Sequence, residues 1–349
     1  MAETVNTTVD GIPERVLGRT GVRLSELGLG GVGFGGSQSP TAPRVADCLE
    51  AYDAAWEAGI RYFDTAPWYG RGLSEHRAGE GLLQRPIGEY VLSTKVGRLL
   101  RPRPRSSVAA EWDRGLQFEV RFDYSYAGVM RSYEDSLQRL SLPAIDLALV
   151  HDLDTGYHSP PERLEAHLAQ LITGGWNALR DLREAGLVRG IGFGVNGVGY
   201  IPRFLQLFDV DFFLVAQPYT LLDQSALREE LPLCQERGVG IVIGAPFQSG
   251  ILATGAVAGA RYNYGAATPE QIARVRAIDA VCNRHQVPLG AAALQFPLGH
   301  PSVASVIPGA LEAAHVRANV EAFHHPIPAA MWDELRAKGL LPADAPTPG

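Results

Sequence analysis

The chain has 349 residues, 46% of them hydrophobic, with 31 basic and 38 acidic residues and a formal net charge of −7. This balance excludes a fibrous or disordered chain, and it provides no basic surface of the kind that binds nucleic acid. No segment reaches the run of about 18 apolar residues that a membrane span needs, and residues 1–15 lack the pattern of a signal peptide. The three widely spaced cysteines predict buried free thiols and a cytoplasmic protein.

Short apolar runs alternate along the chain with helical patterns. After a predicted hairpin at residues 15–25, the sequence indicates eight strands, at residues 26–34, 60–64, 90–95, 145–151, 187–194, 211–217, 240–246 and 303–309. Most of these runs are apolar almost throughout, which is typical of strands that are covered on both faces.

The segments between the predicted strands carry helix signals. Residues 126–140 repeat apolar side chains at spacings of three and four, and residues 268–271 form a capping box with proline at the first helical position. No composition break divides the alternation of strands and helices. The sequence therefore predicts an α/β fold, a single (β/α)8 TIM barrel domain over residues 1–349, with an N-terminal β-hairpin and a C-terminal helical extension.

The glycine-rich stretch "GLGGVGFGG" resembles a nucleotide-binding fingerprint. Gly28, Gly30 and Gly33 match G-x-G-x-x-G, a pattern in which a helix should begin on the glycine loop and an acid should follow about 20 residues later. Here helical pattern resumes only near Pro43, and the available acids fall inside that helix. We therefore assign the glycines to the first barrel strand and its loop.

Three strands in succession end on an ionisable residue, namely Asp64, Lys95 and His151, and Tyr69 follows Asp64 in the same loop. Taken singly, these residues would be a cap, a surface lysine and a core histidine. Together on the C-terminal rim of a barrel they indicate a hydride-transfer site. Lys95, held by Asp64, is expected to lower the pKa of the Tyr69 phenol, so that Tyr69 moves a proton while His151 orients the substrate oxygen. A nicotinamide cofactor would carry the hydride.

The motifs "FDTAPWYG", "STKVG" and "LVHD" resemble the Asp-Tyr-Lys-His tetrad of the aldo-keto reductase superfamily. The resemblance covers almost the whole chain. Longer stretches such as "FDYSYAGVMRSYEDSLQRL" and "PFQSGILA" look like the bacterial aldose 1-dehydrogenases, to which pyridoxal dehydrogenases are related. The resemblance implies NAD(P)-dependent oxidation of an aldose at its anomeric C1 to a lactone, with the Tyr69 phenolate as proton acceptor.

The resemblance also implies a cofactor site. Asn196 and Gln217 would hold the nicotinamide carboxamide, and Gly30 and Gly31 would lie beside the ribose. Residues of two later loops would cover the pyrophosphate and the adenosine, namely Pro246, Phe247, Ser249 and Gly250 for the former and Gly309, His315 and Asn319 for the latter. NADPH-preferring relatives place a lysine and an arginine where this chain has Gly309 and His315. The expectation is therefore NAD, with NADP as the open alternative.

The substrate is expected to be a small molecule, a sugar or an aldehyde, held by apolar walls and His151. The side chains expected to line it are Trp68, Trp112, Phe118, His151 and Tyr219. Two departures from the family pattern stand out. Gly244 replaces the aromatic residue that stacks on nicotinamide, and Gln217–Pro218 replaces the Gly-Arg of the aldose dehydrogenases. Pyridoxal oxidised as its hemiacetal, or carbonyl reduction, therefore stays open.

Two other classes of protein are alternatives to a hydride-transfer enzyme. The first is a cofactor-sensing regulatory subunit on the same fold. The second is a metal enzyme, but His324–His325 lacks matching ligands, so no metal is expected. The basic run at residues 98–105 contains prolines and is expected to be a solvated loop. The oligomeric state stays open.

Overall fold

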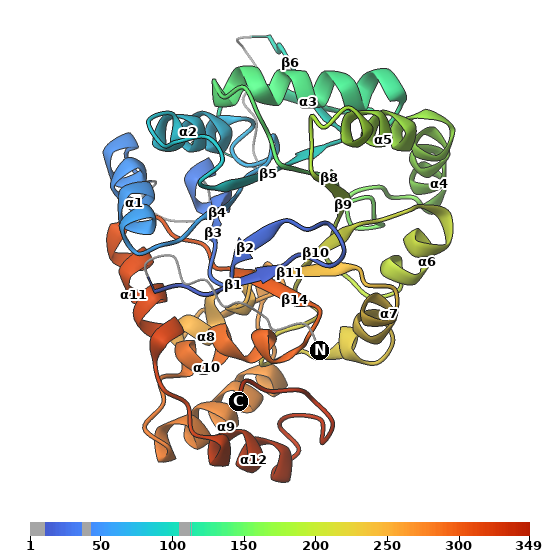
Figure 1. Cartoon of the computed structure of the whole chain (residues 1–349). Coiled ribbons are helices and arrows are strands. Elements are labelled where there is room, and N and C mark those ends of the chain that lie inside the picture. The colour runs from blue at the N-terminus through green and yellow to red at the C-terminus, as the bar shows by residue number, and fades with distance from the viewer. Residues whose placement is uncertain (1–10, 37–42, 105–111, 113) are drawn as a thin grey trace.

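The computed structural model describes residues 11–36, 43–104, 112 and 114–349. Most of the N-terminal segment in which no signal peptide was expected, residues 1–10, lies outside these ranges, as do Arg105 and the neighbours of Trp112. Eight parallel strands follow one another around a nearly closed barrel (Figure 1), in the order β3 (Leu29–Gly30), β4 (Tyr62–Asp64), β5 (Val91–Val96), β8 (Leu147–His151), β9 (Gly190–Val195), β10 (Phe212–Ala216), β11 (Gly240–Gly244) and β14 (Val303–Ile307). The eight predicted strands and the barrel are confirmed.

Two isolated parallel bridges close the ring between its first and last strands. Leu27 pairs with Val306 and Gly30 pairs with Gly309. Glycine is needed here because neighbouring strands approach closely: a Cβ on Gly31 would lie 2.6 Å from the carbonyl oxygen of Asp64. The glycine-rich stretch continues into a short 3-10 helix, η1 (Gly31–Gly35), and α1 begins only at Val45. The rejection of a Rossmann turn is therefore confirmed.

Helices surround the barrel on its outside (Figure 1). They are α1 (Val45–Glu57), α2 (Leu73–Leu82), α3 (Tyr126–Leu140), α4 (Pro161–Gln170), α5 (Trp176–Glu184), α6 (Tyr200–Leu207), α7 (Glu230–Glu236), α8 (Ile251–Thr254), α9 (Pro269–Arg284), α10 (Leu289–Gln295), α11 (Ala313–His324) and α12 (Ala329–Ala337). Their ends follow the local sequence. The Ser125 side chain caps α3, and Thr268 and Gln271 form the predicted capping box of α9.

The core has two parts. A large apolar layer fills the space between strands and helices, and a smaller cluster fills the barrel interior at its N-terminal end. The predicted N-terminal hairpin, β1 (Glu14–Val16) with β2 (Arg23–Ser25), supplies Leu17, Val22 and Leu24 to that smaller cluster. It closes the end of the barrel where the strands begin. An active site is therefore expected at the opposite end, where the strands finish.

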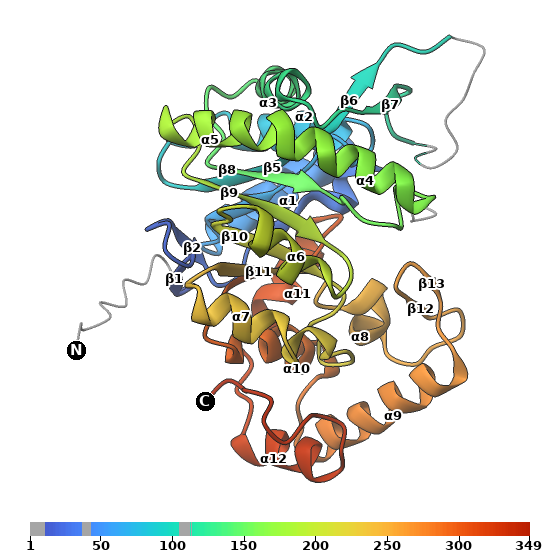
Figure 2. The same ribbon diagram turned by 90° about the vertical axis from the view of Figure 1, so that its right-hand side faces the viewer.

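Two further hairpins extend a pair of loops on the side where the strands end. β6 (Arg98–Arg101) pairs with β7 (Glu119–Phe122), and β12 (Arg261–Tyr262) pairs with β13 (Gly265–Ala266). Figure 2 shows both on the side away from β1 and β2. The expectation of a solvated loop at residues 98–105 was wrong at its start. Arg98 is 1% exposed, because antiparallel pairing with Phe122 draws it into the protein.

Phe193 on β9 joins the barrel to its helices. Its fully buried ring stacks on Trp176 and Phe204 at centroid distances of 5.1 and 4.2 Å. We predict that Phe193→Ala lowers the free energy of unfolding by about 3–5 kcal/mol because it leaves a cavity. Urea denaturation followed by circular dichroism measures the loss. The half-exposed Leu207→Ala on α6 is the control and should cost below about 1 kcal/mol. Equal losses would contradict this view of the core.

Candidate active site

A buried ion pair lies at the centre of the site. β4 and β5 run side by side, and their C-terminal ends bring Asp64 and Lys95 together. The Lys95 Nζ atom lies 2.8 and 2.7 Å from the two carboxylate oxygens of Asp64 and donates to the Thr65 carbonyl at 2.9 Å. The Ser93 hydroxyl donates to Asp64 Oδ1 at 2.7 Å. Both charged side chains are almost fully buried, and such a pair persists only when its hydrogen bonds are satisfied in this way.

Tyr69 lies over this pair, in the turn that follows β4. The centroid of its ring is 4.9 Å from Lys95 Nζ. The turn is held by hydrogen bonds from Tyr69 N to the Ala66 carbonyl and from Ser74 N to the Tyr69 carbonyl. Gly70, at φ +63°, allows this turn to pack on η1, since a Cβ there would lie 2.1 Å from the Gly35 carbonyl oxygen.

The protonation of Tyr69 differs from the expectation. Burial raises its pKa well above the ordinary value, and the Asp64 and Asp152 carboxylates raise it further. Lys95 does not reverse this effect, because its charge is already neutralised by Asp64 at hydrogen-bonding distance. The expected lowering of the Tyr69 pKa is therefore wrong, and Tyr69 is a neutral phenol in this structure.

His151, at the end of β8, completes the predicted group. Its ring meets that of Tyr69 edge to face at a centroid distance of 5.7 Å, and it is 4% exposed. Burial lowers the His151 pKa well below its usual value, and the nearby cations of Arg98 and Lys95 lower it further. The imidazole is therefore neutral at physiological pH, and one of its nitrogens can donate a hydrogen bond while the other can accept one.

Two residues next to His151 were missed by sequence reasoning. Asp152 places Oδ2 3.2 Å from His151 Nε2, and Arg98 donates to the same carboxylate oxygen at 2.7 Å. Asp152 adopts φ +45°, a conformation that L-residues rarely take, and this turns its side chain back toward the site. The only sequence signals were the Asp in "LVHD" and the basic run that begins with Arg98.

The residues expected to bind the nicotinamide fit that group in different degrees. Gln217 adopts φ +85°, and neither polar atom of its buried side-chain amide has a hydrogen bond of ordinary geometry to another described residue. A carboxamide offers the complementary donor and acceptor, so this orphaned amide suits a nicotinamide. Asn196 instead donates its amide to Asp152 Oδ1 at 2.8 Å, which ties it to the group around His151.

The remaining expected cofactor residues lie on loops at the same end of the barrel. Pro246, Phe247, Ser249 and Gly250 follow β11 in a tight turn, in which Ser249 and Gly250 have φ of +59° and +98°. Gly309, His315 and Asn319 are brought together after β14, where the Asn319 amide donates to the Gly309 carbonyl at 3.4 Å. A Cβ on Gly309 would meet no atom within 4 Å, so packing does not require this glycine. Gly30 pairs with Gly309 across the barrel seam.

The predicted substrate walls divide into two sets. The rings of Trp68 and Trp112 meet edge to face at a centroid distance of 5.8 Å, and the Trp112 ring lies 6.5 Å from that of Tyr69. Both indoles therefore lie beside Tyr69. Phe118 precedes β7 and is 36% exposed. The assignment of Tyr219 is wrong. Its ring is fully buried against Phe296 and His300, because the chain after β10 turns this side chain into the helical layer.

Two tyrosines that the sequence did not suggest also adjoin the site. The Tyr264 phenol, on the hairpin β12–β13, interacts with the Gln217 amide, an interaction that opposes the rise of the Tyr264 pKa caused by burial. Tyr157 lies edge to face with Trp68 at 6.5 Å, and burial raises its pKa to about 12. Both phenols add to the rise of the Tyr69 pKa. The site is therefore lined with aromatic side chains from loops that are far apart in sequence.

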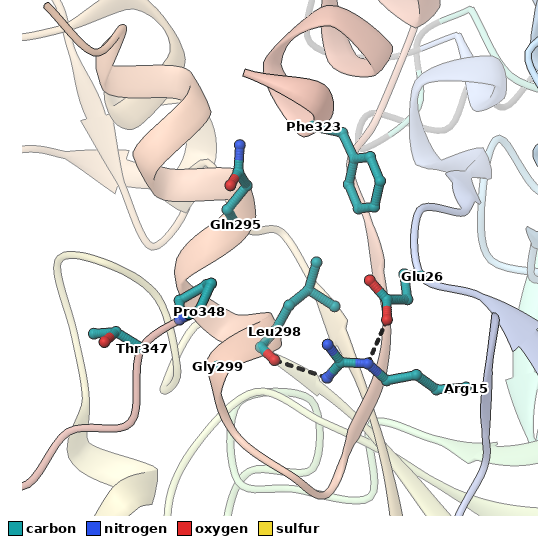
Figure 3. Close-up of a pocket in the computed structure, with 9 residues that line it drawn as sticks. Arg15, Glu26, Gln295, Leu298, Gly299, Phe323, Thr347 and Pro348 are labelled. Carbon is teal, nitrogen blue, oxygen red and sulfur yellow. Dashed lines mark hydrogen bonds and ion pairs between the residues drawn. The ribbon is translucent and has the colours of Figure 1, made fainter. Parts of the chain in front are cut away.

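Other features of the described residues lie outside this site. The pocket in Figure 3 is at the opposite end of the barrel, where Arg15 is held by Glu26 at 2.5 Å and by the Leu298 carbonyl at 2.7 Å. No cluster of three or more histidine, cysteine or acidic side chains suited to a metal occurs within the described ranges. Over the same ranges, no helix is long and apolar enough to cross a bilayer.

The fold and the tetrad define a (β/α)8 oxidoreductase. The model of the aldo/keto reductase family matches residues 26–339, and the chain belongs to that family. It is 43% identical to pyridoxal 4-dehydrogenase of Microbacterium luteolum, over 94% of this chain and 98% of that one. It is 39% identical to D-threo-aldose 1-dehydrogenase of a Pseudomonas species, over 90% and 96%. The holo form of a Bacillus halodurans aldo-keto reductase superimposes with a TM-score of 0.71 at 27% identity, over 96% and 98%.

We predict that Lys95→Met lowers turnover about 100-fold or more, because the proton-transfer group loses its cation. It should also destabilise the fold by about 3–5 kcal/mol, since Asp64 is left buried and unpaired. The double variant Lys95→Met/Asp64→Asn separates the two effects. Thermal unfolding should show recovery of stability in the double variant, while steady-state assays show no recovery of turnover. Recovery of both would mean that the pair is only structural.

Proposed function

We propose that this protein oxidises a cyclic hemiacetal to a lactone with NAD, and that the substrate is an aldose attacked at C1. The observation that supports the proposal most strongly is the position of Tyr69, which lies between the Lys95–Asp64 pair and the neutral His151. This arrangement offers one group that can take a proton and one that can hold the same oxygen. Pyridoxal 4-dehydrogenase and D-threo-aldose 1-dehydrogenase, the two relatives compared above, are both named as dehydrogenases, which supports the direction of oxidation.

The chemistry can be written from the side chains of the chain. Tyr69 first releases its phenol proton to solvent, and the phenolate then takes the proton of the hemiacetal hydroxyl while the C–H bond electrons leave as hydride and the C–O bond becomes the lactone carbonyl. A bound nicotinamide would supply the hydride acceptor, and its positive charge would favour the Tyr69 phenolate. His151 hydrogen-bonds the substrate oxygen, and Lys95 helps to stabilise the negative charge of the Tyr69 phenolate. Trp68 and Trp112 present apolar surface to the ring of the substrate.

Pyridoxal is the second candidate substrate. Its aldehyde and neighbouring hydroxymethyl group close to a cyclic hemiacetal, so the same proton and hydride transfers would give a lactone. The 43% identity to pyridoxal 4-dehydrogenase favours it, as does Pro218 in the place of the arginine of the aldose pattern.

A regulatory role is the remaining alternative. A putative potassium channel β-subunit of Schizosaccharomyces pombe is 27% identical over 89% of this chain. The complete tetrad favours turnover over a scaffold role, since a scaffold has no need of a buried, neutralised lysine beneath a tyrosine.

We predict that the protein forms NADH from NAD when L-fucose, D-arabinose or L-galactose is supplied. NADH absorbance measures this turnover, and D-glucose and pyridoxal are assayed in parallel. Tyr69→Phe should abolish most of this turnover, because it removes the proton acceptor, while NADH binding measured by fluorescence persists. Turnover with pyridoxal alone would move the proposal to the second candidate. If the wild-type protein binds NADH but converts none of the panel, the regulatory role is the better account.

We further propose that NAD is preferred to NADP. His315, at the expected adenosine end, lies 3.8 Å from the Glu312 carboxylate, and its Nδ1 atom accepts a hydrogen bond from Leu311 N at 3.3 Å. A 2′-phosphate there would meet a negative charge in place of the cations of NADPH-preferring relatives. A reducing, cytoplasmic location is part of the proposal, because Cys48, Cys234 and Cys282 are all buried free thiols.

We predict that His315→Arg raises kcat/KM with NADP about 5- to 10-fold, since an exposed arginine gains a screened, charge-assisted contact with the phosphate. The value with NAD should change little. Steady-state kinetics with both cofactors measure the ratio, and His324→Arg, at the far end of α11, is the matched control. A wild-type protein that already uses NADP as well as NAD would contradict the assignment.

A further inference from the structure

The buried cation of Arg98 has no role in the tetrad, although it lies beside it. Its guanidinium is stacked among three rings, at 4.3 Å from Tyr157, 4.9 Å from Trp68 and 5.3 Å from Phe122. It is 1% exposed, and such a charge is costly to bury unless a carboxylate compensates it. The carboxylate that does so is Asp152, which receives Arg98 Nη2 at 2.7 Å.

Asp152 is in turn fixed on both of its oxygens. Oδ2 accepts from Arg98 and lies 3.2 Å from His151 Nε2, while Oδ1 accepts from the Asn196 amide at 2.8 Å. The left-handed backbone at Asp152 aims the carboxylate at the imidazole. Arg98 on β6 thus contacts Asp152 in the loop after β8, and Asp152 in turn contacts His151.

This contact bears on which imidazole nitrogen carries the proton. His151 Nδ1 is buried, and within the described part of the chain it has no hydrogen-bond partner. A proton on Nδ1 would leave a buried donor unsatisfied and would leave the electron-rich, unprotonated Nε2 only 3.2 Å from the Asp152 carboxylate oxygen. A proton on Nε2 avoids both penalties. The carboxylate therefore favours the tautomer that makes Nε2 a donor.

We propose that Arg98 and Asp152 are a positioning pair for His151: Arg98 holds the Asp152 carboxylate beside Nε2, and the negative charge of the carboxylate keeps the imidazole proton on that nitrogen. The expected effect of this pair on kcat rests on the proposed function, whereas its effect on the His151 tautomer does not. The 3.2 Å contact of Nε2 with Asp152 lacks the geometry of an ordinary hydrogen bond, so the Nε2 proton stays free to stabilise the substrate oxygen as hydride leaves the adjoining carbon. Arg98 and Asp152 act through His151.

The same pair affects the charge state of His151. The Arg98 cation contributes to the lowered His151 pKa and opposes the rise of the Asp152 pKa that burial causes. Loss of Arg98 therefore moves both pKa values upward. The loop that carries Asp152 also brings Asp154 and His158 into this group. The other titratable or charged groups around His151 and Asp152 come from three further elements or loops and are Tyr69, Lys95 and Tyr124.

The test compares Arg98→Met with wild type by nitrogen-15 NMR of the imidazoles, with the His151 signals assigned from His151→Gln. In wild type we expect a neutral ring with the proton on Nε2 between about pH 5 and 8. In Arg98→Met we expect mixed tautomers or protonation within that range, and kcat lowered about 10-fold or more with NADH binding retained. Arg98→Lys, which keeps a cation for Asp152, should recover part of the loss.

A matched control is Arg139→Met, which removes an arginine from the fully buried Glu75 carboxylate between α2 and α3. It should leave the His151 tautomer and kcat at their wild-type values. If Arg98→Met does not fold, Asp152→Asn keeps the shape of the site and removes the charge, and it should mix the tautomers in the same way. An unchanged tautomer in whichever of these variants folds would overturn the proposal.

The two proposals can fail separately. A wild-type protein without turnover on any hemiacetal defeats the proposed function, but the NMR comparison still decides whether Arg98 and Asp152 set the His151 tautomer. Conversely, turnover with a tautomer that is indifferent to Arg98 and Asp152 would leave the proposed function intact and defeat the positioning pair.

Discussion

The site depends on burying one ammonium group without losing its partners. Lys95 and Asp64 lie at 1% and 2% exposure, and the desolvation of both charges is offset by short contacts with each other, with the Ser93 hydroxyl and with the Thr65 carbonyl. Asp64 and Lys95 come together because the adjacent parallel strands that carry them end at the same rim of the barrel. Tyr69 lies over the resulting pair, and His151 comes from the next strand around the barrel.

The same burial determines the chemistry of the phenol. It raises the pKa of Tyr69, so formation of the phenolate needs a further positive charge beside it. It also keeps His151 neutral. The Arg98–Asp152 pair extends the same buried electrostatics to the orientation of the imidazole.

Much of this could be predicted from the sequence. Apolar runs that end on Asp64, Lys95 and His151 predicted both the strands and their shared rim, since side chains at the ends of parallel strands must meet there. What the sequence could not predict depends on contacts between distant segments. Arg98 looks like part of a solvated basic run until its pairing with Phe122 is known. Tyr219 looks like a substrate wall until the turn after β10 directs it against Phe296.

The central proposal is that Tyr69 takes the hydroxyl proton of the hemiacetal while hydride passes from the hemiacetal carbon to a nicotinamide. The most direct measurement uses an aldose deuterated at C1, and pyridoxal deuterated at the aldehyde carbon, with the reduced cofactor analysed by mass spectrometry and NMR. The account predicts one deuterium transferred to the nicotinamide and a slower turnover that is slowed further in Lys95→Met. Reduced cofactor without deuterium would show that the hydride comes from another carbon and would contradict the account.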